Sequence, residues 1–217
     1  MIKFRVRNLE VKFLFCFLSI LFLLFTHNSQ LTTHNCYAEP TYVDHFEKSI
    51  NLLGGRTSVY EQAPSRALAV TTDKEHYGAG SRSLALRYDK KNTGGPYGGG
   101  GWCGYYSILK TGPKYFDAAG FTRLTFWVKG EKGDENFVVG LSDRHWEQVG
   151  DSVKSEEIGV YLQDRKVTTE WQQAVIPMDV FFIDMKELAS LAISFESDGF
   201  PEGKGAGVVY IDEIAFE

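Results

Sequence analysis

The sequence has little cysteine, and what it has cannot form a disulfide within the predicted mature domain. Two of its three cysteines, Cys16 and Cys36, lie in a predicted leader, which leaves Cys103 alone. A domain of this kind is expected to be stabilised by its hydrophobic core, and the absence of a disulfide slightly favours a structural cation.

No apolar run in the chain is long enough to span a bilayer. The longest comprises the 13 residues 13–25, whereas a membrane-spanning helix needs about 20. Basic residues precede it, and a polar stretch ending at Ala38 follows, which is typical of a signal peptide. We therefore expect residues 1–38 to be a leader and residues 39–217 to form one exported domain. A retained anchor and a lipid on Cys36 are the alternatives.

Basic residues are also scarce in the predicted domain. The leader holds four of the 23 Lys and Arg residues and one of the 28 Asp and Glu residues, which leaves 19 against 27 and a net charge of −8. An excess of acid disfavours a nucleic-acid partner.

Helical periodicity and internal repeats are nearly absent. Short alternating segments bounded by Gly, Pro and Asp predict about ten strands instead. The clearest segments are 42–47, 57–60, 67–72, 83–88, 105–109, 121–130, 137–141, 158–162, 168–177, 191–195 and 207–217. This pattern predicts an all-β fold, a jelly-roll β-sandwich of two antiparallel sheets, and the lack of a 20–50-residue repeat argues against a propeller.

Several catalytic motifs are missing. No Lys followed by Ser or Thr comes after the glycine run 98–101, and no Gly-x-Ser-x-Gly sequence occurs. Asp143, His145 and Glu147 alternate and can be interpreted as an acid, a base and a partner or as metal ligands, but no second histidine lies nearby. Glycoside hydrolysis needs two opposed carboxyl groups, and no such pair is evident. Binding without catalysis is therefore expected.

Five motifs together resemble a known family. They are Val43-Asp44-His45-Phe46-Glu47, Gly80-Ser81-Arg82-Ser83-Leu84, Phe126-Trp127-Val128-Lys129-Gly130, residues 169–177 around Trp171, and Val209-Tyr210-Ile211-Asp212-Glu213-Ile214. Their order resembles the galactose-binding-like jelly rolls, and within them the family 11 carbohydrate-binding modules.

The resemblance implies a structural calcium between the first and last strands. Carboxylates of that family's site match Glu47 and Asp212, and Asp44 is a third candidate; hard oxygen ligands of this kind suit calcium. The alternative is that Asp212 accepts bonds from neighbouring backbone amides, or is turned outward by a β-bulge.

Carbohydrate recognition needs flat rings to stack on sugar faces and polar groups to bind hydroxyls. Trp127 and Tyr161 are candidate rings, with Arg87 and Gln163 at the edges, if their strands share a sheet. The other candidates come from the glycine-rich side and from the loop after residue 142: Trp102, Tyr105, Tyr106, Asp143, Arg144, His145 and Trp146. Trp171 is expected to pack in the fold.

These observations predict a secreted or periplasmic, non-catalytic module that binds a poly- or oligosaccharide. It would have no membrane span after leader cleavage, and a protein partner in the cell envelope is allowed. The alternative is an assembly factor on the same sandwich, similar to the complex I intermediate-associated protein 30 family. A glycoside hydrolase-associated subunit is the third possibility.

Overall fold

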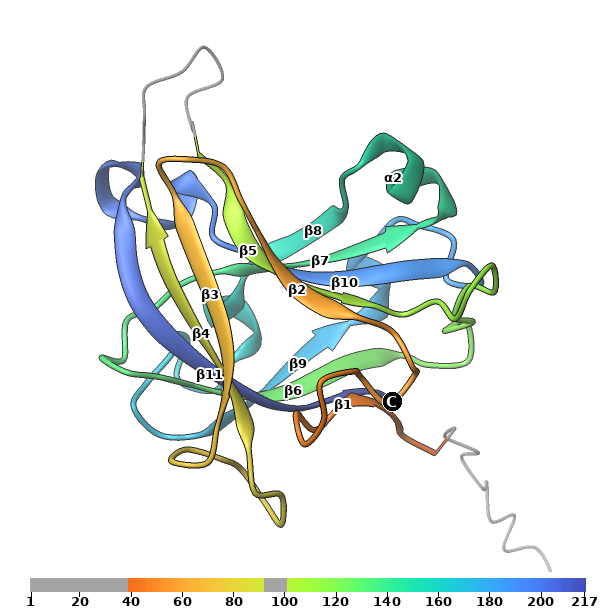
Figure 1. Ribbon diagram of the computed structural model, residues 1–217, viewed down its shortest axis with the longest axis horizontal. Coiled ribbons are helices and arrows are strands. Elements are labelled where there is room, and N and C mark those ends of the chain that lie inside the picture. The colour runs from red at the N-terminus through yellow and green to blue at the C-terminus, as the bar shows by residue number, and fades with distance from the viewer. Residues whose placement is uncertain (1–38, 92–100) are drawn as a thin grey trace, which may run out of the picture. The chain divides into compact units, whose positions relative to one another are not determined.

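The computed structural model describes residues 39–91 and 101–217. Within them, two antiparallel sheets face each other, as Figure 1 shows. The sheet strands are β1 Thr41–Asp44, β2 Thr57–Glu61, β3 Arg66–Thr72, β4 Ser83–Lys90, β5 Cys103–Ile108, β6 Arg123–Gly130, β7 Val138–Asp143, β8 Val153–Glu157, β9 Gln172–Pro177, β10 Leu188–Ser194 and β11 Gly205–Phe216. The predicted all-β sandwich is confirmed.

Helical segments are short and lie between the strands. They are α2 Arg144–Val149, η1 Ile158–Tyr161, η2 Met178–Val180, η3 Ser197–Gly199 and η4 Pro201–Gly203. Across the described part of the chain, no helix has the length and apolar character needed to cross a bilayer. The predicted leader and most of the glycine run fall outside the described residues.

The last strand organises the six-stranded sheet. β11 pairs with β4 on one side and with β6 on the other, and β1 joins its C-terminal end; β3 and β9 form the two ends of the sheet order. The second sheet has the order β2-β5-β10-β7-β8. In this arrangement residues far apart in sequence come to share one face.

A β-bulge near the end of β11 changes which residues face the core. The register between β11 and β6 shifts between Asp212 and Ala215, and Glu213 has a φ of 51°. As a result Ile211 and Ile214, which differ in parity, are both 1% exposed or less. Asp212 is paired with Trp127 and lies on the outer face of the sheet. The β-bulge that the sequence analysis considered at this residue is therefore present, directly after Asp212.

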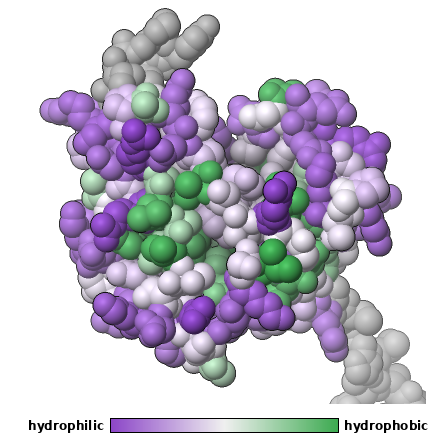
Figure 2. All heavy atoms as spheres, viewed as in Figure 1, coloured by the Kyte–Doolittle hydropathy of each residue, from purple (hydrophilic) through white to green (hydrophobic). Residues whose placement is uncertain are grey.

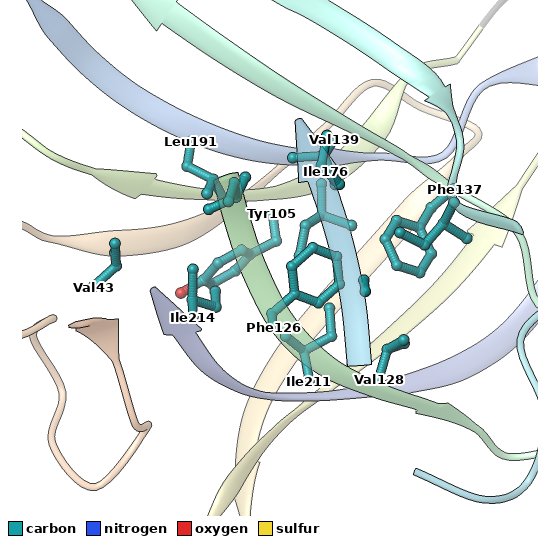
Figure 3. Packing of buried hydrophobic residues seen from close by; sticks show 14 of the residues in the cluster. Val43, Tyr105, Phe126, Val128, Phe137, Val139, Ile176, Leu191, Ile211 and Ile214 are labelled. Atoms are coloured by element: carbon teal, nitrogen blue, oxygen red, sulfur yellow. The ribbon is translucent and has the colours of Figure 1, made fainter. Parts of the chain in front are cut away.

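The core lies between the sheets. Figure 3 shows buried side chains from both layers in the space between the sheets, among them Phe126 and Ile211 from one sheet and Tyr105 and Leu191 from the other. Cys103 is a buried free cysteine at the start of β5. Interdigitation of this kind holds two sheets about 10 Å apart and fixes the two outer faces as separate surfaces.

The predicted strand 158–162 is wrong. Residues 158–161 form the 3₁₀ helix η1, in which Ile158 and Leu162 are buried while Val160 is half exposed. Apolar residues at 158 and 162 fit one helical turn as well as a strand, so alternation over five residues did not distinguish the two. The prediction also missed β8, whose Lys and Glu residues give a weak strand signal.

Candidate functional site

The predicted site residues do not share one surface. Arg87 and Trp127 lie on the outer face of the six-stranded sheet, and Trp102 precedes β5 in the other sheet. Tyr105 is 1% exposed and belongs to the core, so it is not available to a ligand. This corrects the expectation that Tyr105 contributes to a binding surface.

Tyr161 also does not lie beside Trp127. Tyr161 ends η1 and packs against the hydrophobic core, and its hydroxyl accepts a hydrogen bond from the Glu156 amide at 3.3 Å. Gln163 follows on an exposed segment. Because residues 158–162 are not a strand, Tyr161 and Trp127 do not form a shared platform.

Trp127 is itself partly covered. The ring of Tyr77, from the connection between β3 and β4, stacks on it with centroids 3.5 Å apart and an angle of 14° between the planes. Trp171 contacts Tyr77 edge-on, which confirms its predicted packing role. Lys129 pairs with Glu75 at 2.7 Å beside these rings. The rings of Tyr77, Trp127 and Trp171 therefore pack against one another, and Trp127 has one face covered by Tyr77.

Arg87 lines an open hollow of about 790 Å³ on the same face, together with Leu68 and Val208. Figure 2 shows hydrophobic surface where β3 lies, and the exposed apolar residues of that strand are Leu68 and Val70. No ring is exposed in this hollow, since its one aromatic lining residue, Tyr88, is 4% exposed. A sugar bound in this hollow would therefore find no exposed aromatic ring to stack on.

The loop predicted at residues 143–147 is the end of β7 and the start of α2. Asp143 caps the helix, accepting hydrogen bonds from the Trp146 and Asp184 amides at 2.9 Å. Arg144 pairs with Glu187 at 2.7 Å. Glu147 pairs with Lys110 and accepts a bond from Tyr115. Three of the predicted functional groups thus hold α2 in place.

The outer face of the five-stranded sheet has a different character. One row of residues in register crosses all five strands, in the order Ser58, Tyr106, Ala192, Gly140 and Lys154. Tyr106 is half-buried and has the opposite parity from core residue Tyr105. A single ring therefore stands beside small residues in the middle of the sheet.

A second row lies beside the first and ends in another ring. It runs Tyr60, Gly104, Ser194, Val138 and Glu157. A Cβ on Gly104 would contact the Tyr60 ring, so this ring lies over the glycine, and the Tyr60 hydroxyl is hydrogen-bonded to Ser194. Trp102 lies next to Tyr60, with centroids 5.8 Å apart, and is 50% exposed.

We call this surface the ring face: Tyr60, Trp102 and Tyr106 above a floor of Gly104, Gly140 and Ala192. Lys154 borders it and pairs with Glu196 at 3.0 Å. Side chains cover both glycines, since the Tyr60 ring lies over Gly104 and Ser152 lies over Gly140. The groups left for a ligand are therefore the rings of Trp102 and Tyr106 and the polar groups around them. Sequence reasoning missed Tyr60 and Lys154. The isolated glycine within β5 is the signal that could have located Tyr60, because it indicates a close approach.

The sequence pattern of the family described as carbohydrate binding domain 30 matches residues 45–217. The chain belongs to this family. It is accordingly a carbohydrate-binding module, and the predicted resemblance is confirmed. The comparison with curated proteins found no match.

Solved structures of similar fold include two carbohydrate-binding modules from Clostridium thermocellum. A family 11 module in complex with a β-1,3-1,4-mixed-linked tetrasaccharide is 14% identical, with a TM-score of 0.59 and coverage of 82% of this chain and 94% of that one. A family 30 module of a cellulosomal cellulase is 19% identical, with a TM-score of 0.58 and coverage of 82% and 96%. These likenesses show the fold.

A β-1,2-glucanase from Parabacteroides distasonis is also similar. It is 14% identical with a TM-score of 0.56, and the match covers 81% of this chain but 24% of the glucanase. The sandwich therefore also occurs as part of a much larger enzyme chain.

The predicted calcium ligands are only partly brought together. Asp44 and Asp212 are buried, and the charge of Asp212 acts on Asp44. Burial raises the pKa of each to about 6. Glu47 instead accepts hydrogen bonds from Ser81 and Arg82. In residues 39–91 and 101–217, no three His, Cys, Asp or Glu side chains gather as metal ligands. Both carboxylate oxygens of Asp212 accept backbone amide hydrogen bonds, from Tyr77 and from Glu213, each at 2.8 Å. The alternative considered for Asp212 is therefore present in the structure.

Proposed function

We propose that the module binds a polysaccharide on the ring face and does not cleave it. The observation that carries this proposal is the grouping of Tyr60, Trp102 and Tyr106 beside a floor of small residues, on the outer face of one sheet. A glucan chain lying across β5, β10 and β7 would stack its sugar rings on Trp102 and Tyr106. Its hydroxyls would bind Ser58 and Lys154 at the border.

Binding without cleavage follows from the groups this face presents. In the two rows Glu157, at the end of the second, carries the one carboxyl group, and the other residues supply rings, hydroxyls, an amine and small side chains. Hydrolysis of a glycosidic bond requires two carboxyl groups on either side of it. The family 11 relative is in complex with a mixed-linked β-glucan tetrasaccharide, which makes soluble β-glucans the first ligands to test.

Affinity electrophoresis through gels containing soluble polysaccharides tests the proposal. The panel should include mixed-linkage β-1,3-1,4-glucan, xyloglucan, β-1,2-glucan and mannan, with a gel free of polysaccharide as reference. We expect retardation by at least one β-glucan and no release of reducing sugar. The absence of retardation by every polymer would favour the assembly-factor alternative, and sugar release would identify an enzyme.

We also propose export, supported by the basic and apolar pattern before residue 39. A polysaccharide ligand outside the cell is consistent with this location. Mass spectrometry of the protein recovered from its host would test it, with an N-terminus at Glu39 as the expected result.

A calcium ion between Asp44 and Asp212 is a further proposal. The charges of these two buried carboxylates act on each other, and a calcium ion, which prefers such oxygen ligands, would offset them. If calcium at about 100 times its Kd stabilises the fold by about 2.7 kcal/mol, chelation should lower Tm by roughly 5–10 °C.

Differential scanning calorimetry with EDTA and with added calcium measures this effect. In Asp212→Asn the response to calcium should disappear, whereas Glu47→Gln should retain it, because Glu47 binds Ser81 and Arg82 instead. An identical Tm with and without calcium in the unsubstituted protein would reject the metal.

A further inference from the structure

A second hollow, apart from the two rows of the ring face, lies beside α2. It has a volume of about 720 Å³ and lies between the start of α2 and the segment 178–185 that joins β9 to β10. Most of its lining is apolar: Trp146, Met178, Phe181, Phe182, Ile183 and Met185. The motif at residues 143–147 therefore contributes to a surface that carbohydrate binding on the ring face does not use.

One residue that lines this hollow, Phe182, has its aromatic ring exposed to solvent. Phe182 is 88% exposed, whereas its neighbour Phe181 is 2% exposed. Burying such a side chain against a partner is favourable, because it removes apolar surface from water. A lone exposed apolar residue needs no explanation, but one that borders an apolar hollow is typical of an interaction site.

The charged residues that line the hollow are acidic. Asp179 is exposed, Asp184 is exposed with one carboxylate oxygen accepting a bond from the Lys186 amide, and Asp143 is buried as the helix cap. His145 is the one lining residue that can become positive. Negative potential beside aromatic rings favours a cationic group.

This charge pattern decides between possible occupants. A second copy of the chain would bring Asp179 and Asp184 of both copies together, so self-association is opposed. A sugar would need more hydroxyl-binding groups than a lining rich in Met, Ile and Phe provides. A basic segment with an apolar residue matches both the lining and the charge.

We propose that the hollow is a docking site for a short segment of another protein, in which a lysine or arginine adjoins an apolar side chain. The apolar side chain enters the hollow between Trp146 and Phe182, and the cation lies against Asp179 and Asp184. This site would attach the module to a protein partner while the ring face holds polysaccharide. It goes beyond the proposed function and does not depend on it.

Selection from a phage library of random dodecapeptides tests this proposal. Peptides are selected on the unsubstituted protein and counter-selected on Phe182→Ser, then synthesised and titrated calorimetrically. We expect enrichment of Lys or Arg beside an apolar residue, with affinity about tenfold weaker for Phe182→Ser and for Asp179→Asn. Leu68→Ser, which removes a half-exposed apolar residue outside the hollow, should bind as the unsubstituted protein does.

The same variants give the results that would overturn the proposal. Selected peptides without a basic residue, or peptides that bind Phe182→Ser unchanged, would reject the docking site. A dimer seen in sedimentation and lost in Phe182→Ser would assign the hollow to a second copy. Loss of polysaccharide retardation in Phe182→Ser would assign it to sugar. Trp102→Ala should leave peptide affinity unchanged, which separates this site from the ring face.

Discussion

Replacement of Trp102 by alanine should weaken polysaccharide binding by about tenfold, and the double replacement of Trp102 and Tyr106 should abolish retardation. Trp102 is 50% exposed and leans towards Tyr60, so its free surface is available to a sugar ring. Stacking on an aromatic side chain contributes on the order of 1–2 kcal/mol, and 1.4 kcal/mol corresponds to a factor of ten in Kd. Affinity electrophoresis and calorimetric titration with the retarding glucan measure both effects.

Trp127→Ala is the matched control, because Trp127 lies on the opposite face of the sandwich. This variant should bind glucan normally although its stability decreases, since Tyr77 loses its stacking partner. The converse result, in which Trp127 is required and Trp102 is not, would move the carbohydrate site to the six-stranded sheet. Circular dichroism of both variants separates a lost contact from a lost fold.

Strand alternation predicted the core well because each strand carries its own pattern. In β6, Leu124, Phe126 and Val128 are all buried, as their spacing indicates. The same pattern in β11 failed after Asp212, because the bulge adds a residue and reverses the faces. A bulge is determined by the pairing of two strands, which the alternation of one strand does not contain.

The ring face was only partly predictable for a related reason. Parity shows which residues of one strand share a face, but not which sheet that strand joins or which side faces the core. Tyr105 and Tyr106 are chemically alike, and only the packing of β5 against the other sheet assigns one to the core and the other to the surface. Trp102 was identified as a candidate because it follows a glycine run. Its neighbour Tyr60 comes from β2, more than 40 residues earlier in the chain.

The structure gives the 143–147 motif different roles from those predicted. Its concentration of Asp, Arg, His, Trp and Glu suggested binding or catalysis, but most of these groups satisfy helix and ion-pair contacts around α2. Such contacts depend on residues 110, 115, 184 and 187, which lie elsewhere in the sequence. A dense polar motif therefore did not by itself distinguish a scaffold from a site.

Gly104→Ala should have the largest effect on stability at the ring face. A Cβ at this position would collide with the Ile193 carbonyl of the neighbouring strand and with the Tyr60 ring. Overpacking of this kind costs roughly 3 kcal/mol, which lowers Tm by about 6–12 °C. Because Tyr60 must move, glucan affinity should decrease as well.

Gly120→Ala is the matched control, because a Cβ at this position would meet open space. This variant should change stability by less than about 0.5 kcal/mol. If thermal unfolding of the two variants coincides, the close contact between Tyr60 and β5 that builds the ring face is refuted.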